Sequence, residues 1–487
     1  MDVSLGIDLG TSGVKVALVD ALGRAVAVST RTFAIRIPQP SWAEAAPAEW
    51  ARATRDALGE ILARTPDATI VAVGIDGQMH GVVLARGTQP VRDAVLWPDA
   101  RATAELDLWR AAPEEVRAAL ANPLSAGMAG PILAWLARHE REAIEAADVA
   151  LAPKDWLRLQ LVPDSRVTDP SDASATLLWD IPAGNWSAPM LSAAGIDPTL
   201  LPPVQPSGAP AGHVEPTAAR AWGLPAGIPV SVGCGDSAAT LLAARPAPEQ
   251  VIVTVGTGLQ VARAGAPPRA NASPEFHTFA SAAGDHYVMA AATNGGLALG
   301  RVVDLLGASW HELYDSLDRP MVGTGAFLPY FTAERLPRPL PAGAAGWRDL
   351  SLGTDRAALL RTAVEAMGFL ARRGLEALPA TGTAEVRLTG GGTRDRRVQQ
   401  LLANVFGRPV RRCRTENLTA LGAALLGWSA AGAQVEPDVE LDDEVTPALS
   451  SNYDAQYARF AQLTDELASA SATLAPGVAA LATNNKE

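Results

Sequence analysis

The stretch GIDLGTSGVKVALVD, residues 6–20, decides the fold of the first part of this 487-residue chain. Two runs rich in apolar, β-branched residues flank the turn Gly10-Thr11-Ser12-Gly13, a pattern that predicts a β-hairpin. The glycines let the backbone approach a ligand closely, and Lys15 adds a positive charge beyond the turn. Asp8 lies in the first strand, just before the turn. The pattern predicts either a loop for phosphate oxygens beside a metal-binding carboxylate or an ordinary surface hairpin.

The composition is that of a folded protein with more than one hydrophobic core. Apolar residues make up 48% of the chain and charged residues 19%, and the length exceeds what a single core supports. The net charge of −12 argues against nucleic-acid and anionic-membrane partners. Two cysteines, Cys234 and Cys413, cannot form a disulfide framework. Neither a signal peptide nor a membrane-spanning run is visible, so we expect a cytoplasmic protein.

A second hairpin of the same kind is predicted far downstream, at residues 251–263 (VIVTVGTGLQVAR). Its turn Gly256-Thr257-Gly258 aligns with Gly10-Thr11-Ser12. In both halves the hairpin precedes an amphipathic helix and then a buried strand that ends in a Gly-rich loop. The helices are expected near 48–64 and 355–378, and the strands with their loops at 71–81 and 386–395. The repeated order predicts two related α/β domains, each with a phosphate-binding turn.

Two prolines between apolar segments, in LLAARPAPEQ at residues 241–250, mark the expected domain boundary. We therefore expect a first domain over residues 1–244 and a second over 245–430. An acidic loop and a C-terminal helix should follow over 431–487.

Five motifs along the chain resemble those of the FGGY family of carbohydrate kinases, over roughly residues 1–430. They are GIDLGTS (6–12), CGDSAA (234–239), VGTG (255–258), TGGGTRD (389–395) and LTALGAALLG (418–427). The resemblance implies the fold of the superfamily shared by actin, hexokinase and the heat-shock ATPases. Two actin-like (ribonuclease H-like) α/β domains would then close over a cleft and transfer the γ-phosphoryl group of MgATP to a sugar.

Asp236 is the residue with the most specific implied role. From spacing alone, an Asp between the strand VSVGC and the segment SAATLLAA could be a helix N-cap. The resemblance implies instead that Asp236 is the general base, which accepts the proton of the attacking sugar hydroxyl. Asp8 would act with it on the magnesium side, and the two carboxylates supply the hard oxygen ligands that Mg²⁺ prefers.

The two hairpin turns and a third glycine loop are the predicted ATP site. Backbone amides and hydroxyls on opposing turns can grip a phosphate chain without a Walker A loop, and that motif is absent. The resemblance assigns the adenosine to the third loop. The expected nucleotide-binding residues are Gly10, Thr11, Ser12, Lys15, Gly256, Thr257, Gly258, Gly390, Gly391 and Gly392.

The acceptor is predicted from two motifs in the first half. GQMHG (77–81) and LWPDAR (96–101) resemble the versions found in the xylulose-phosphorylating (xylulokinase) members of the family, which implies D-xylulose as substrate and D-xylulose 5-phosphate as product. An imidazole can exchange hydrogen bonds with sugar hydroxyls, and a methionine can pack against the carbon skeleton. The expected sugar contacts are Met79, His80, Trp97, Asp99, Arg101 and Asp236.

Three departures from the family pattern concern the sugar pocket. Pro98 stands where the usual W-N-D-G-R loop has Asn, and residues 333–337 read AERLP in place of G-E-R-T-P. The segment 293–296 (TNGG) resembles gluconate kinases of the same family. Gluconate or another pentulose therefore stays open as the acceptor.

Alternatives from other classes are a nucleotide-driven switch or filament protein and a sugar-binding module without catalysis. The GQMHG loop and Asp236 argue against the switch, and the presence of Asp8, Thr11, Thr257 and Asp236 argues against the inactive module. As partners the resemblance suggests the sugar, ATP and a second copy of the chain in a homodimer.

Overall fold

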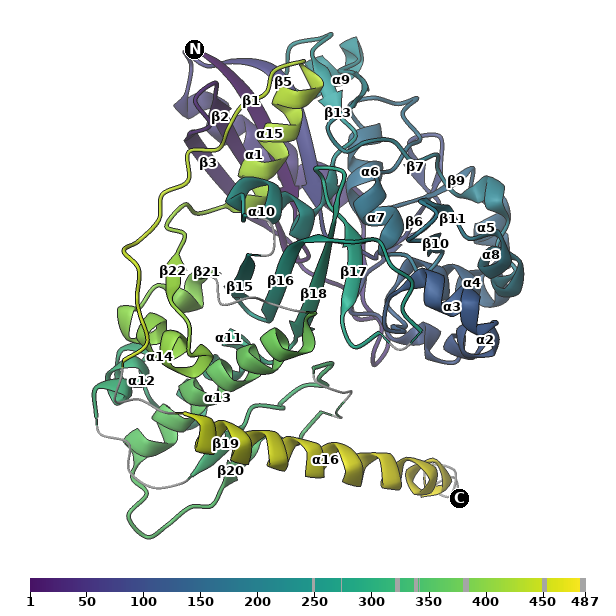
Figure 1. Ribbon diagram of the computed structural model, residues 1–487. Coiled ribbons are helices and arrows are strands. Elements are labelled where there is room, and N and C mark those ends of the chain that lie inside the picture. Colours follow the sequence, from purple (N-terminus) through teal and green to yellow (C-terminus); the bar gives the residue numbers. More distant parts are fainter. Residues whose placement is uncertain are drawn as a thin grey trace. The chain divides into compact units, whose positions relative to one another are not determined.

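The computed structural model describes residues 1–247, 250–272, 274–319, 325–336, 340, 342–379, 385–448 and 453–481, the last eleven of these by backbone only. The chain divides into two compact units. Unit 1 comprises Met1–Arg245, Gly265–Tyr287 and Asn417–Val439, and unit 2 comprises Pro246–Ala264, Val288–Glu416 and Glu440–Glu487. Each unit contains its own mixed β-sheet with helices packed on it (Figure 1).

Unit 1 contains most of the short strands and helices. Its strands are β1 (Asp2–Leu9), β2 (Gly13–Asp20), β3 (Ala25–Thr32), β4 (Glu44–Ala45), β5 (Thr69–Gly77), β6 (Val83–Arg86), β7 (Gln89–Pro90), β8 (Ala94–Val95), β9 (Val149–Leu151), β10 (Trp179–Asp180), β11 (Asn185–Trp186), β12 (Pro210–His213), β13 (Pro229–Ser231), β14 (Cys234–Gly235) and β17 (His277–Ala280). Its helices are α1 (Pro47–Arg64), α2 (Leu106–Ala111), α3 (Glu114–Leu120), α4 (Ala129–His139), α5 (Arg141–Ala146), α6 (Pro153–Leu159), α7 (Pro170–Ser174), α8 (Ala188–Ala194), α9 (Pro216–Trp222), α10 (Asp236–Ala244) and α15 (Leu418–Ala430).

The predicted first hairpin is confirmed and lies in the central sheet of unit 1. The strand order is β12-β13-β5-β1-β2-β3, and β14 pairs with β5 beside this path. β1 runs antiparallel to β2 and parallel to β5. Residues 3–9 of β1, which alternate between the two faces of the sheet, are all buried, because a central strand is covered on both faces.

Helix α15 lies directly on β1 and β5, and two glycines make this approach possible. A Cβ atom at Gly6 would lie 2.0 Å from the carbonyl oxygen of Ala420, and one at Gly74 would lie 1.7 Å from that of Ala423. Both neighbours are backbone atoms of α15, which cannot rotate away as a side chain can. Small residues at these positions therefore set the distance between the helix and the sheet.

We expect Gly74→Ala to lower the free energy of unfolding by about 3 kcal/mol or more, since a methyl group would separate α15 from β5. Gly59→Ala is the matched control, because Gly59 is exposed in α1 with no atom within 4 Å of its added Cβ. That change should stabilise the protein by about 0.5–1 kcal/mol through helix propensity. Urea unfolding of both variants measures the effects, and a Gly74→Ala variant as stable as the parent would contradict this packing.

Unit 2 repeats the arrangement of the first hairpin. Its strands are β15 (Val251–Val255), β16 (Leu259–Ala266), β18 (His286–Ala292), β19 (Ala326–Leu328), β20 (Gly346–Arg348), β21 (Val386–Thr389) and β22 (Val410–Arg412), where β16 and β18 each extend a few residues into unit 1. Its helices are α11 (Gly296–Leu305), α12 (Trp310–Asp315), α13 (Arg356–Ala377), α14 (Arg396–Phe406) and α16 (Asp454–Leu481).

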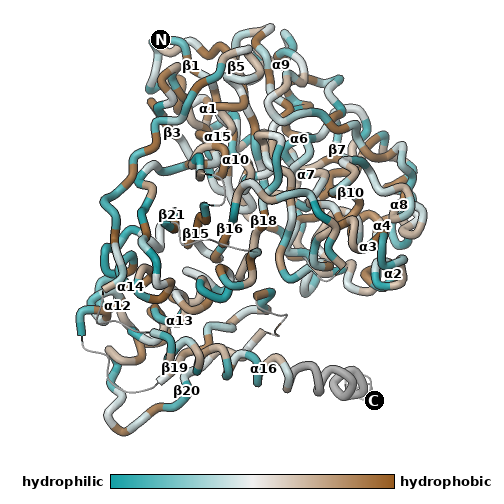
Figure 2. The backbone as a smooth tube through the Cα atoms, viewed as in Figure 1, coloured by the Kyte–Doolittle hydropathy of each residue, from teal (hydrophilic) through white to brown (hydrophobic). Residues whose placement is uncertain are grey.

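The sheet of unit 2 has the order β18-β16-β15-β21-β22. β15 pairs antiparallel with β16 and parallel with β21, as β1 does with β2 and β5. The predicted repeat of hairpin, helix and strand is therefore confirmed, and in both units that strand pairs parallel with the first strand of the hairpin. The helices on this sheet are amphipathic: polar and apolar residues mix along α13 and α14 (Figure 2), and Val398, Leu401 and Leu402 of α14 are buried.

Candidate active site

Three aspartates meet at one edge of the sheet in unit 1. Asp8 pairs with Asp76 in the parallel register of β1 and β5, and Asp76 pairs with Cys234 of β14. Asp236 follows β14 directly as the first residue of α10. Because these strands are parallel, their carboxyl ends bring the three side chains to the same edge, which in open α/β sheets is where ligands bind.

The Asp8 carboxylate is held from two sides. Lys15, its cross-strand partner, places Nζ 3.5 Å from Oδ2 of Asp8, and Thr419 of α15 donates a hydrogen bond to the same oxygen. Asp8 is buried, whereas the Lys15 side chain is 42% exposed. Thr419 lies in the motif LTALGAALLG but was not among the predicted site residues, and it is 411 residues from Asp8 in the chain.

Asp76 is the most deeply buried of the three aspartates. Within the described residues, neither of its carboxylate oxygens has a hydrogen-bond donor. Burial raises the pKa of Asp76 well above its ordinary value, and the charges on Asp8 and Asp236 act in the same direction. A raised pKa favours the neutral, protonated form of Asp76, so this carboxyl group adds little negative charge beside Asp8.

Asp236 combines a fixed orientation with a raised pKa. Its Oδ1 accepts hydrogen bonds from the backbone N–H of Ser237 at 2.6 Å and from the Ser237 hydroxyl at 3.2 Å. Burial and the nearby charge of Asp8 raise the pKa of Asp236 to about 6. Gly235, not Asp236, is the N-cap residue of α10, so the capping alternative does not account for this carboxylate. An Asp with this pKa is ionised at neutral pH and still basic enough to accept a proton.

Two side chains from elsewhere in unit 1 hold the turn at residues 10–13, the first predicted phosphate site. Trp97 Nε1 donates to Thr11 Oγ1 at 2.8 Å, and Gln78 Nε2 donates to the carbonyl oxygen of Gly10 at 3.4 Å. The Trp97 indole, which we predicted as a sugar contact, thus binds the turn that we predicted as a phosphate contact.

Met79 and His80 follow β5 in a sharp turn. His80 has φ +73°, and the N–H of Gly81 donates to the carbonyl of Met79 at 2.9 Å, a tight three-residue turn that an L-residue adopts only under strain. Nδ1 of His80 lies 2.7 Å from the carbonyl of Ala175. A carbonyl only accepts, so Nδ1 carries the proton and Nε2 is the acceptor nitrogen of the neutral ring.

Aromatic residues that the sequence reading missed surround this turn. The His80 ring lies 5.8 Å from Phe279 and 6.4 Å from His277, and the Tyr287 hydroxyl lies 3.8 Å from Met79 Sδ. A strand with aromatic residues at alternate positions, such as β17, was the available signal.

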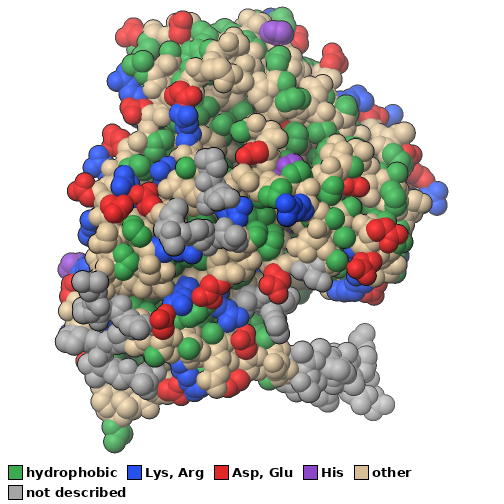
Figure 3. Space-filling view, viewed as in Figure 1, with side chains coloured by type: hydrophobic (Ala, Val, Ile, Leu, Met, Phe, Trp, Pro, Cys, Tyr) green, Lys and Arg blue, Asp and Glu red, His purple; other side chains and the backbone are tan. Residues whose placement is uncertain are grey.

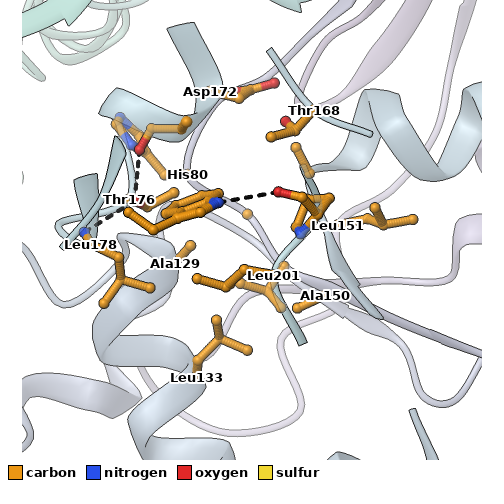
Figure 4. Close-up of a pocket in the computed structure, with 16 residues that line it drawn as sticks. His80, Ala129, Leu133, Ala150, Leu151, Thr168, Asp172, Thr176, Leu178 and Leu201 are labelled. Carbon is orange, nitrogen blue, oxygen red and sulfur yellow. Dashed lines mark hydrogen bonds between the residues drawn. The ribbon is translucent and has the colours of Figure 1, made fainter. Parts of the chain in front are cut away.

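A small cavity lies next to His80, lined by Thr168, Asp172 and Thr176 together with apolar side chains such as Leu133 and Leu201 (Figure 4). Its volume of about 40 Å³ has room for a few water molecules.

Asp99 and Arg101, two further predicted sugar contacts, bind each other. Arg101 Nη2 lies 2.8 Å from Asp99 Oδ2 and 2.7 Å from Glu44 Oε1, and its guanidinium stacks 3.6 Å from the centre of the Trp42 ring. Asp99 also accepts from the N–H of Ala43 at 2.6 Å. The pair is buried, so most of its hydrogen-bonding capacity is used within the chain, and its contact with a sugar stays a prediction.

Unit 2 contains a cavity of about 590 Å³ over the second hairpin turn and the third glycine loop. The lining residues are Gly256, Thr257, Gly391 and Gly392, together with Gly296, Leu297, Leu299, Gly300, Arg301, Asp304, Trp310 and Tyr314. Gly390, which precedes the lining residue Gly391, has φ +87°, and a Cβ atom there would lie only 2.4 Å from the carbonyl oxygen of Val255. The cavity brings together predicted phosphate and adenosine residues, and Trp310 and Tyr314 add aromatic surface that the sequence reading missed.

Glu334, in the segment that departs from the family pattern, holds the loop before α11. Its carboxylate accepts from the N–H groups of Thr293 and Asn294, and Asn294 Nδ2 donates to it at 3.0 Å. Of the segment 333–337, Ala333, Glu334 and Leu336 lie within the described residues, and Pro337 lies outside them.

Charge and hydropathy define the remaining surface. On the face drawn in Figure 3, acidic and basic side chains are interspersed. Over the described residues, no helix has the length and apolar content needed to cross a bilayer. In the same residues, no group of three or more His, Cys, Asp or Glu side chains is arranged to bind a metal ion.

Comparison with known proteins agrees with the geometry. The profile of the FGGY carbohydrate kinase N-terminal domain matches residues 3–243, and that of the C-terminal domain matches residues 277–431. Xylulose kinase of Escherichia coli (strain K12) is 31% identical over 443 residues, which cover 88% of this chain and 90% of that protein. Xylulose kinase of Streptomyces coelicolor is 32% identical over 439 residues, 86% of each chain.

Solved structures give the same result for the fold. The crystal structure of xylulose kinase from Rhodospirillum rubrum aligns with a TM-score of 0.84 at 26% identity, covering 97% of this chain and 99% of that chain. The predicted two-domain sugar-kinase fold is confirmed. With both domain profiles matched across most of its length, the chain belongs to the FGGY family of carbohydrate kinases.

Proposed function

We propose that this protein transfers the γ-phosphoryl group of ATP to D-xylulose and releases D-xylulose 5-phosphate and ADP. The single observation that carries the proposal is the Asp236 carboxylate, held at a helix N-terminus with its pKa raised to about 6, next to Asp8. The choice of xylulose rests on the GQMHG loop and on the relatives named above.

In the reaction, Asp236 accepts the proton of the attacking hydroxyl as its oxygen bonds to the γ-phosphorus and the bond from that phosphorus to the oxygen leaving with ADP breaks. The Ser237 N–H and hydroxyl hold Oδ1, which leaves Oδ2 to face the acceptor. Met79 and His80 orient the sugar, with Nε2 of His80 accepting from a hydroxyl group. Trp97, Asp99 and Arg101 shape the same region of unit 1, Trp97 through its bond to Thr11.

ATP binds with its base and ribose in the cavity of unit 2, near Gly390, Gly391 and Gly392. Thr257 lines that cavity and contacts the phosphates together with Gly256 and Gly258. Gly10, Thr11, Ser12 and Lys15 supply the amides, hydroxyls and ammonium group of the first turn. Transfer requires the terminal phosphate and the acceptor hydroxyl to meet.

The donor set fits Mg²⁺, which usually takes one or two carboxylates and completes its shell with water and phosphate oxygens. Asp8 and Asp236 would hold the ion, and when bound it neutralises charge on the transferring phosphate. Lys15 and Thr419 keep the Asp8 carboxylate in position for this role.

The decisive test of the substrate is ADP release with a panel of ketoses, polyols and gluconate. We expect D-xylulose to give the highest kcat/KM. Turnover on gluconate without turnover on xylulose would reject the sugar and keep the kinase. ADP release that is independent of any acceptor would instead favour a nucleotide-driven switch.

The pH dependence follows from the pKa of Asp236. The base acts only when ionised, so kcat/KM for the sugar should be flat above about pH 7 and fall tenfold per unit below about pH 6. A profile measured at saturating ATP and Mg²⁺ checks this, and activity that stays constant down to pH 5 would argue against Asp236 as base.

We also propose a cytoplasmic homodimer, following the family resemblance. Light scattering after size-exclusion chromatography measures the oligomeric state directly, and a monomer at micromolar concentration would reject the dimer.

A further inference from the structure

Five charged side chains are buried together in unit 1 without a part in the reaction above. Lys154, Asp155 and Arg158 belong to α6, and Asp169 and Asp172 lie at the start of α7. Lys154 Nζ lies 2.6 Å from Asp155 Oδ1 and 3.1 Å from both Asp169 Oδ1 and Asp172 Oδ2. Burying charges costs free energy even when they are paired. We therefore ask which parts of the backbone the buried charges hold through hydrogen bonds.

The cluster holds the segment 232–235, which leads into Asp236. Arg158 Nη1 donates to the carbonyl of Val232 at 2.5 Å. The N–H of Gly233 donates to the carbonyl of Ser207 at 2.9 Å, and the N–H of Gly235 donates to Ser171 Oγ at 2.8 Å. Hydrogen bonds thus hold the backbone before Asp236 at three residues, Val232, Gly233 and Gly235.

Ser171 is the link between the charges and the final amide of this segment. Its hydroxyl donates to Asp169 Oδ2 at 2.6 Å, which turns the oxygen lone pairs toward the N–H of Gly235. Asp169 is itself fixed by Lys154 and by the Ser207 hydroxyl at 2.9 Å, and it caps α7 through the N–H of Ser171. The connection runs from Lys154 through Asp169 and Ser171 to Gly235.

The position of Gly235 is tightly constrained by its neighbours. It pairs with Gly77 of β5, and a Cβ atom there would lie 2.7 Å from Met79 Cγ. Its amide direction sets where the next residue, Asp236, begins α10. A small rotation at Gly235 would therefore move the Asp236 carboxylate relative to Met79 and His80.

We propose that Ser171 is a positioning residue for phosphoryl transfer, which orients the Asp236 carboxylate through the amide of Gly235. This inference rests on the proposed function, in which Asp236 is the general base. Ser171 is fully buried, and it acts on the turn that carries the base.

The test compares Ser171→Ala with Ser207→Ala in the full-length protein. Both hydroxyls are buried and both donate to Asp169 Oδ2, but only Ser171 uses its side chain to hold the segment before Asp236. We expect Ser171→Ala to lower kcat about 10- to 100-fold with KM for ATP unchanged within twofold. Ser207→Ala should keep kcat within about twofold, and both should lower Tm by a similar few degrees.

Equal losses of kcat in the two variants would show a merely structural role and overturn the proposal, as would a normal kcat in Ser171→Ala. Ser171→Thr keeps the hydroxyl and supplies a second readout if alanine prevents folding. Retention of kcat within about threefold supports the proposal, and a tenfold loss at unchanged Tm overturns it. The Asp236→Asn variant separates the two levels: if it stays active, the proposed base is wrong whatever Ser171 does.

Discussion

Replacing Asp236 with asparagine is expected to lower kcat for sugar phosphorylation by about 10²- to 10⁴-fold. Asparagine has nearly the same shape and can still accept the hydrogen bond from the Ser237 N–H, so the turn into α10 should be preserved. It cannot accept the proton of the attacking hydroxyl. Coupled measurement of ADP release with D-xylulose gives kcat and both KM values.

Two controls accompany this variant. KM for ATP should stay within about threefold of the parent value, because the proposed nucleotide contacts lie on other residues, and the Tm should change little. A near-normal kcat in Asp236→Asn would reject the assignment of the base. A raised KM for ATP with unchanged kcat would place Asp236 in nucleotide binding instead.

Asp8→Asn is the second change with a large expected effect, a loss of about 10²-fold or more in kcat. The substitution removes the charge that would hold Mg²⁺ and leaves an acceptor for the Thr419 hydroxyl. We therefore expect the Mg²⁺ concentration at half-maximal activity to rise as well. Activity titrated with Mg²⁺ at fixed ATP and sugar measures both quantities.

The matched control is Asp2→Asn at the exposed start of the same strand. It makes the same change of charge on β1, far along the strand from the turn, and kcat should remain within about twofold. If Asp8→Asn lowered kcat with no change in the Mg²⁺ dependence, Asp8 would stabilise the transition state in another way.

The hairpins were predictable because their signals are local. Alternating β-branched residues around a glycine turn specify both β1–β2 and β15–β16, and the observed strands agree with the predicted ones. The repeat in the sequence predicted the strand at β5, and its parallel pairing with β1 came from the structure. Its consequence, the register that places Asp76 beside Asp8, required the structure.

Contacts between distant segments were the part that sequence could not supply. The motif LTALGAALLG contains Thr419, but nothing in the motif predicted that the Thr419 hydroxyl donates a hydrogen bond to Asp8. Trp97 was expected to present its ring to a sugar, and its indole N–H binds Thr11. In both cases the hydrogen bond depends on how segments far apart in the chain pack together, which no local pattern predicts.

The aromatic lining of the unit 2 cavity shows the same limit. Trp310 and Tyr314 lie one turn apart on α12, a spacing that fits packing as well as binding. Only the structure shows that they line the same cavity as Gly391 and Gly392, where we propose that the nucleotide binds.

The most direct test of the central claim is ³¹P NMR of a reaction of the purified protein with MgATP and D-xylulose. We predict loss of the γ-phosphate signal of ATP and stoichiometric growth of one phosphate-monoester signal that matches D-xylulose 5-phosphate. Conversion of the same γ-phosphate to inorganic phosphate, with no sugar ester formed, would contradict the account.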